Sequence, residues 1–198
     1  MNVAGAPQRE TRRMHAPQTV GEIVATGAAG GILLLLAIMA LQVRGCPGPS
    51  PVARGDIGGG RLLFPVPAVS VGAMSDSFAD RRGNRTHLAV DILAPRGSPV
   101  IAVDEGTVAR LSSDQAGGIS IYQFDAAEHY CFFYAHLDRY AEGLAQGQPV
   151  KRGQLIGYVG TTGNAPANTP HLHFAISEVT VPKQWWGGHP IDPYPLWK

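Results

Sequence analysis

The long C-terminal part of the chain, residues 61–198, predicts an all-β domain, a mainly antiparallel sheet, barrel or sandwich. The chain contains 25 Gly and 16 Pro, residues that break helices and serve turns. Short apolar or alternating runs are separated by Gly, Asp and Pro, and no long segment of helical period interrupts them. The clearest runs are Pro99–Val103, Gly118–Tyr122, Tyr130–Tyr134 and Leu155–Val159. An antiparallel barrel or sandwich is therefore favoured over an α/β arrangement.

The N-terminal part has a different character. Residues 1–22 are polar and carry Arg9, Arg12 and Arg13, and the uncharged stretch 23–43 follows. As a helix rising about 1.5 Å per residue, this stretch would span roughly 30 Å, the thickness of a bilayer core. Basic residues ahead of such a segment favour a cytoplasmic N-terminus and an exported C-terminal body. We therefore expect a short cytoplasmic tail at 1–22 and a membrane helix at 23–43.

Several fates of residues 23–43 remain open. The segment is either an uncleaved signal anchor, a cleaved signal peptide, or a leader replaced by lipidation at Cys46. Its most apolar part has the length of a signal-peptide core, yet no clear cleavage site follows, and Arg44 fits a lipoprotein box poorly. A twin-arginine export signal at Arg12 and Arg13 and a buried core helix are weaker alternatives.

Residues 44–60 are dense in Gly and Pro and lack apolar periodicity, which is typical of a linker. The sequence therefore predicts four parts, which are 1–22, 23–43, 44–60 and 61–198.

Charge and cysteine content limit the possible partners and sites. Sixteen Lys and Arg against fifteen Asp and Glu give a formal charge of +1, so no summed field favours nucleic acid, and we expect no nucleic-acid partner. The cysteines, Cys46 and Cys131, are too few for a disulfide framework or a cysteine-based zinc site. Cys131 lies in an apolar run and is interpreted as a buried free thiol.

The strongest chemical signal is the stretch Pro170–Ile176. Its residues alternate as in a half-buried strand, which places His171 and His173 on one face, opposite an apolar face. Two imidazoles that point into one site favour metal binding or acid/base chemistry over a structural role.

A second element is His87–Asp91, which follows a polar stretch at 81–86 interpreted as a loop. Fully extended, His87 and Asp91 would lie about 13 Å apart, so the chain must bend if both are to hold one ion. A glycine at position 89 would ease that bend, but the residue is Ala89. On its own this pair is a weak motif, since a surface His and a surface Asp are common.

Together His87, Asp91 and His173 supply three N/O ligands, which leave the fourth position of a tetrahedral zinc open for a water that attacks an amide. No H-E-x-x-H helix provides the usual glutamate base, so His171 is the natural substitute. Period-2 alternation places Tyr134 and His136 on one face, from which His136 could reach the same cleft. His136 and His171 would then serve as acid/base and oxyanion stabiliser, in an order that stays open.

These motifs resemble, in order along residues 61–198, the lysostaphin-type (LytM-like) zinc metallopeptidases. The resemblance is carried by His87–Asp91, Ala94–Val100, Gly106–Val108, Tyr134–Leu137, Gly147–Gly157, Gly160–Gly163, His171–Phe174 and Pro190–Pro193. Ala89 stands where the family usually has glycine, and the approach to the histidine pair, residues 163–170, also departs from the family pattern.

The resemblance implies a compact, mainly antiparallel fold with an active-site groove across the sheet. It also implies a peptidoglycan endopeptidase with one catalytic zinc on His87, Asp91 and His173, and with His136 and His171 as catalytic residues. It further implies that the substrate is the peptide stems of bacterial peptidoglycan and that the site of action is the cell envelope. The domain would be membrane-anchored and face the periplasm or exterior, or be secreted if the signal is cleaved. The alternatives are a non-catalytic relative that binds peptidoglycan or activates an amidase, and a β-barrel binding module with an incidental zinc.

Overall fold

The computed structural model describes Ile57 and residues 62–198. The predicted tail 1–22, the predicted membrane segment 23–43 and the linker 44–60 apart from Ile57 lie outside the described residues. Within the described part of the chain, no helix combines the length and apolar character needed to cross a membrane.

The described part of the chain is built from β-strands, and its helices are short 3-10 turns. The turns are η2 (Val71–Ala73) and η3 (Tyr194–Leu196). The strands are β1 (Arg81–Arg82), β2 (Arg85–Thr86), β3 (Val90–Leu93), β4 (Pro99–Ile101), β5 (Gly106–Asp114), β6 (Gly118–Asp125), β7 (Tyr130–Tyr140), β8 (Pro149–Val150), β9 (Leu155–Val159), β10 (His171–Glu178) and β11 (His189–Ile191). The prediction of an all-β domain is confirmed. The polar stretch 81–86, however, is a β1–β2 hairpin rather than a loop.

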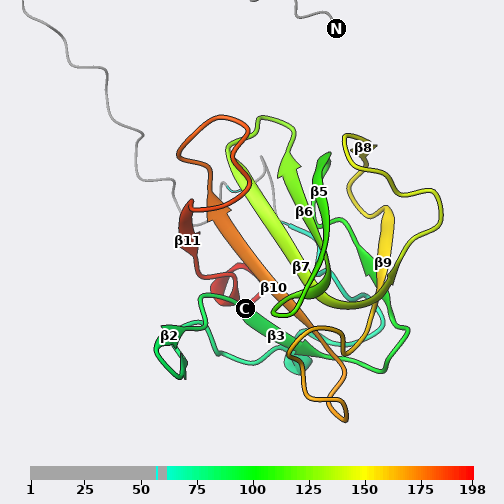
Figure 1. The fold of residues 1–198 in the computed structure, drawn as a ribbon, viewed down its shortest axis with the longest axis vertical. Helices are drawn as coiled ribbons and strands as arrows, with labels where there is room; N and C mark the ends of the chain where they lie inside the picture. Colours follow the sequence, from blue (N-terminus) through cyan, green and yellow to red (C-terminus); the bar gives the residue numbers. More distant parts are fainter. Residues whose placement is uncertain (1–56, 58–61) are drawn as a thin grey trace, which may run out of the picture. The chain divides into compact units, whose positions relative to one another are not determined.

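Among residues 62–198, nine strands form one antiparallel sheet, whose main order is β11-β10-β7-β6-β5-β8. Figure 1 shows the long strands β5, β6, β7 and β10 side by side in this order. Strand β3 also pairs with β10, and β9 pairs with both β4 and β7. Strand β10 therefore lies beside β3 and β7, the strands that carry Asp91 and His136.

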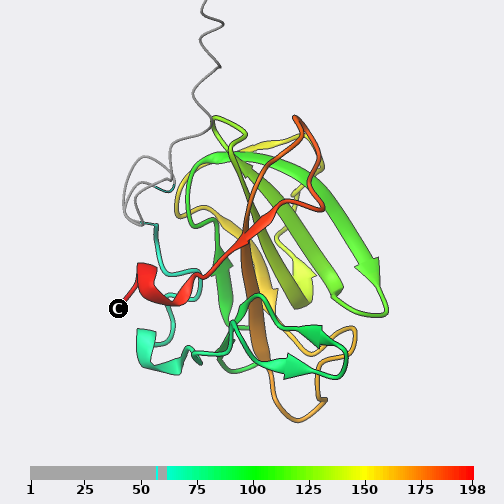
Figure 2. The same ribbon diagram turned by 90° about the vertical axis from the view of Figure 1, so that its left-hand side faces the viewer.

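The core lies against one face of β10, as the alternation of its residues predicts. Leu172, Phe174 and Ile176 are all fully buried, and Phe174 packs against Trp197 near the C-terminus. The Trp197 Nε1–H donates a 3.0 Å hydrogen bond to the carbonyl of Leu62, which joins the last turn to the segment preceding the sheet. Figure 2 shows η3, in red, beside that segment, in cyan. Since the core occupies this face, the opposite face of β10 is left for polar side chains.

Candidate metal centre and active site

The strand register brings Asp91 and His173 together. In the β3–β10 pair His173 lies directly opposite Asp91, and Phe174 lies opposite Val90. Because cross-strand partners share a face of the sheet, Asp91 and His173 point to the polar side while Val90 and Phe174 point into the core. The two residues lie 82 positions apart in sequence, since 173 − 91 = 82, and the pairing alone makes them neighbours.

A bend before β3 brings His87 to the same place. Leu88 adopts a left-handed conformation with φ of 55°, while the following Ala89 is fully buried. The backbone N–H groups of His87 and Leu88 donate to the carbonyls of Asp80 and Phe78, which fixes the bend. The bend that the ligand hypothesis requires is thus present, but the strained residue is Leu88 rather than residue 89.

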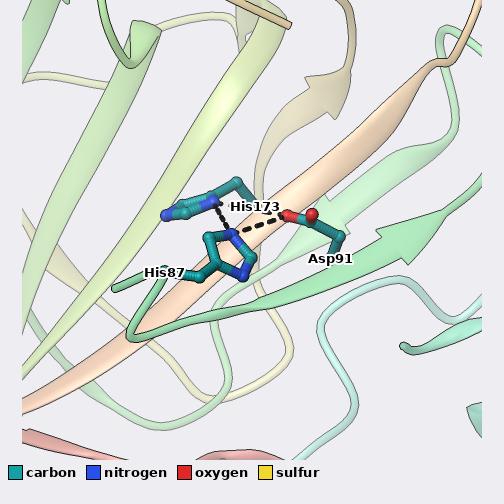
Figure 3. Close-up of side chains that lie close together, drawn as sticks. All are labelled: His87, Asp91 and His173. Carbon is teal, nitrogen blue, oxygen red and sulfur yellow. Dashed lines mark hydrogen bonds and ion pairs between the residues drawn. The ribbon is translucent and has the colours of Figure 1, made fainter. Parts of the chain in front are cut away.

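His87, Asp91 and His173 point toward one another from β3, β10 and the segment preceding β3 (Figure 3). The His87 Nε2 atom lies 2.9 Å from His173 Nδ1, and both nitrogens lie 3.3 Å from Asp91 Oδ1. Ligand atoms of a tetrahedral zinc with bonds of about 2.0–2.1 Å lie about 3.3 Å apart. Two of the three separations match the edge of such a tetrahedron, and the third, between the two histidine nitrogens, is shorter at 2.9 Å.

The surrounding hydrogen bonds orient these three atoms. The carbonyl of Ser77 lies 3.0 Å from His87 Nδ1, and since a carbonyl only accepts, this nitrogen carries the proton and Nε2 keeps its lone pair. Arg82 binds the other carboxylate oxygen, Asp91 Oδ2, at 2.5 Å. Asp91 Oδ1 is buried and has no hydrogen-bond partner. A cation among the three atoms would satisfy this oxygen, so the donor set fits a divalent metal.

Electrostatics favours the metal-binding protonation states of Asp91 and His173. Burial by itself would raise the pKa of Asp91, but His173, His87 and the Arg82 guanidinium hold it far below its usual value. Burial lowers the pKa of His173, and the nearby Asp91 opposes that effect only in part. Near neutral pH this favours a carboxylate beside a neutral imidazole, the forms that bind zinc.

His171 lies beside this cluster on the polar face of β10. Its Nδ1 donates to the carbonyl of Thr169 at 2.8 Å, so Nε2 is the acceptor. That Nε2 atom is buried without a hydrogen-bond partner and lies 3.7 Å from Asp91 Oδ1. A buried acceptor without a partner is costly in a purely structural role, and it suits a group that exchanges protons with a ligand.

His136 reaches the cluster through an irregularity in β7. Tyr134 pairs with Phe174 and is buried in the core, where its hydroxyl donates to Gln123 Oε1. Regular alternation would place His136 on that same core face. His136 instead has φ of 60°, and both Ala135 and His136 line the polar pocket, as in a β-bulge. The prediction that Tyr134 and His136 share a face is wrong, because the left-handed residue interrupts the period of two.

The His136 ring contacts both histidines of β10. Its centroid lies 4.9 Å from that of His171 and 5.6 Å from that of His173. His136 Nδ1 donates to the Thr162 carbonyl at 2.8 Å, which leaves Nε2 as the acceptor. Burial lowers the pKa of His136 to about 4, although that hydrogen bond opposes the shift. Near neutral pH the ring is therefore neutral and able to accept a proton.

The pocket at this site is lined by residues of the hairpin β1–β2 and of strands β5, β6, β7 and β10. Its lining residues are Arg82, Arg85, Thr86, His87, Asp114, Ala116, Gly117, Tyr122, Phe133, Ala135, His136, Asn164 and His173. Sequence reasoning assigned no function to Arg82, although it contacts Asp91. A basic residue in a polar stretch just before a candidate ligand was the signal available in the sequence.

The antiparallel sheet and the His–Asp–His cluster place the molecule in the class of LytM-like metallopeptidases. Residues 85–193 match the model of peptidase family M23, and the chain belongs to this family. The resemblance inferred from the sequence motifs is thereby confirmed.

Two curated relatives and two solved structures illustrate the similarity. The chain is 34% identical over 153 residues to the L-Ala–D-Glu endopeptidase of Bacillus subtilis, covering 72% of this chain and 45% of the relative. It is 36% identical over 90 residues to the peptidoglycan DD-endopeptidase ShyC of Vibrio cholerae, covering 46% of this chain and 20% of the relative. The chain thus spans less than half the length of either relative.

The catalytic domain of lysostaphin from Staphylococcus simulans superimposes with a TM-score of 0.52 at 26% identity, covering 62% of this chain and 89% of that domain. Helicobacter pylori Csd3 gives a TM-score of 0.53 at 28% identity, covering 69% of this chain and 33% of that protein.

Proposed function

We propose that the protein is a zinc-dependent endopeptidase that hydrolyses peptide cross-links of bacterial peptidoglycan. The observation that carries the proposal is the convergence of five side chains on one site, which are His87, Asp91, His136, His171 and His173. Three of them have the spacing of metal ligands, and two present ring nitrogens beside them.

Zinc would be held by His87 Nε2, Asp91 Oδ1 and His173 Nδ1, and when bound it would supply Lewis acidity and an activated water at neutral pH. Arg82 neutralises the second oxygen of Asp91, which fixes the carboxylate with Oδ1 toward the cluster. The Ser77 carbonyl accepts a hydrogen bond from His87 Nδ1 and so orients the His87 ring with Nε2 toward the cluster. These contacts orient the ligands before any substrate binds.

His136 and His171 would act as general acid and base in the reaction. Each ring is oriented by a backbone carbonyl at Nδ1, so each directs Nε2 as its free acceptor. One ring would accept the proton of the attacking water at Nε2, and the other, once protonated at Nε2, would stabilise the oxyanion or donate to the leaving amine.

The substrate assignment is supported by the relatives. One relative is named as an L-Ala–D-Glu endopeptidase and another as a peptidoglycan DD-endopeptidase. We propose peptidoglycan stem peptides as the substrate here, which requires residues 61–198 to act outside the cytoplasm as the peptidase domain. The basic tail 1–22, the uncharged stretch 23–43 and the linker 44–60 would provide export and membrane attachment.

The test measures bound zinc and muropeptide release together, on the wild type, His173→Ala and His171→Ala. We expect one zinc and cleavage for the wild type. His173→Ala should lose both, whereas His171→Ala should keep the zinc and lose cleavage. His189→Ala is a matched control, because that histidine is exposed and lies outside the pocket.

A wild type that holds no zinc and releases no muropeptides would contradict the proposal. That result would favour the non-catalytic alternative, a protein that binds peptidoglycan or activates an amidase.

A further inference from the structure

The hairpin β1–β2 directs two arginines toward the candidate active site. Its register places Arg82 opposite Arg85, and cross-strand partners point to the same side of a hairpin. Arg82 reaches Asp91, so the shared side is the one that faces the metal ligands. Arg85 lines the pocket accordingly, whereas Arg81, one position before Arg82, does not.

Two like charges opposite each other in a hairpin repel, and only one of these has an acidic partner. Arg82 is paired with Asp91 Oδ2. Within residues 62–198 the structure gives the Arg85 side chain no ion pair and no hydrogen bond. The acid in the pocket lining, Asp114, accepts hydrogen bonds at Oδ1 from the backbone N–H groups of Ala116 and Gly117, both at 2.8 Å. The pocket therefore contains a guanidinium that no described anion neutralises.

We infer that Arg85 binds a carboxylate of the substrate peptide, and this inference rests on the proposed function. A guanidinium presents a planar fork of donors that matches a carboxylate and that zinc and the histidines would leave free. An anion at this point would relieve the repulsion between Arg82 and Arg85 as it binds. Arg85 would thus select cross-links whose stem peptides carry a free carboxylate near the cut bond over bridges made only of glycine.

The experiment compares matched peptide substrates on the full chain. One set carries free carboxylates, and in the others a single carboxylate is replaced by a carboxamide, one position at a time. We expect the wild type to lose about tenfold or more in kcat/KM when one particular carboxylate is amidated. The position that matters identifies which carboxylate Arg85 binds.

Arg85→Ala should remove this preference by slowing only the substrate with the free carboxylate, and Arg85→Lys should restore part of it. Arg81→Ala is the matched control from the same hairpin, and it should keep the wild-type preference. Calorimetric binding of the cleaved product peptides provides a readout independent of turnover. There Arg85→Ala should bind the carboxylate and the carboxamide peptide equally.

The possible outcomes separate this inference from the proposed function. A wild type that cuts all the peptides at one rate, or an Arg85→Ala variant that retains the carboxylate preference, would overturn the inference and leave the peptidase proposal standing. A wild type that cuts none of them would overturn the peptidase proposal and the inference with it. Zinc content and melting temperature like those of the wild type would show that Arg85→Ala is folded.

Discussion

Arg82 links the β1–β2 hairpin to the candidate metal ligands, because its guanidinium binds Asp91 Oδ2 at 2.5 Å. Loss of a group that orients a ligand typically lowers metal affinity by about 10–100-fold. We therefore expect Arg82→Ala to weaken zinc binding by about this factor, as measured by competition with a chelator. Arg81→Ala should bind zinc like the wild type. Equal affinities for all three proteins would show that the contact does not orient Asp91.

Leu88 is the strained residue beside the ligands, with φ of 55° and a side chain that is 39% exposed. Left-handed backbone is unfavourable for residues with a Cβ and worst for β-branched ones. Leu88→Gly should therefore raise the free energy of unfolding by about 1 kcal/mol, while Leu88→Val should lower it by a similar amount. Urea unfolding measures both. A destabilised Leu88→Gly protein would mean that packing of the leucine outweighs the strain.

The prediction that Cys131 is a buried free thiol is confirmed, since the residue is 4% exposed. Burial raises the pKa of this thiol to about 12. At pH 8 the folded thiol stays protonated, so in a Cys46→Ser background it should react with a thiol reagent only after unfolding. The unfolded thiol ionises from about pH 9, so this group makes stability fall as the pH rises above that value. Native protein that reacted as fast as unfolded protein would contradict the assignment.

The face on which a single side chain lies could be predicted only where the backbone of its strand is regular. The alternation of Leu172, His173 and Phe174 in a regular strand correctly placed the histidines away from the core. The same rule failed for His136, because its left-handed backbone, with φ of 60°, interrupts the alternation of side chains between the two faces of the strand. No glycine marks the bulge in the sequence around His136, whose backbone N–H donates to the distant Gly117 carbonyl at 2.8 Å.

At the scale of elements, the close approach of β9 and β7 supports the site. A Cβ added to Gly160 would lie 2.3 Å from the Asp138 backbone nitrogen, and Gly160 also bridges to His171. Gly160→Ala should force the strands apart and lower stability by about 2 kcal/mol or more. Thermal unfolding should show a large decrease in melting temperature. Gly72→Ala, whose Cβ would meet only a side-chain oxygen at 3.4 Å, should change little. Equal effects of the two substitutions would contradict this packing argument.

The predicted strands were largely correct because burial imposes their pattern. The run at Leu155–Val159 matches β9, whereas β7 extends well past the predicted Tyr130–Tyr134 to Tyr140. The sheet order and the register of β3 on β10 were not predictable from the sequence, since they arise from pairing between distant segments. It is this register that makes Asp91 and His173 neighbours.

At the scale of the whole molecule, fold and site depend on each other. The apolar face of the sheet packs into one core, and the bends at Leu88 and His136 bring polar groups to its other face. The five histidine and aspartate positions chosen from motifs come together there, and their roles as ligands and catalytic groups stay predictions. The membrane segment 23–43 remains a prediction from the sequence.

The central claim is that His87, Asp91 and His173 hold a zinc ion, and the most direct test is anomalous X-ray diffraction from crystals of the purified protein, recorded on both sides of the zinc absorption edge. We expect one anomalous peak, present only above the edge, within bonding distance of His87 Nε2, Asp91 Oδ1 and His173 Nδ1. No peak at these three atoms in crystals grown with zinc, or a peak on other residues, would contradict it.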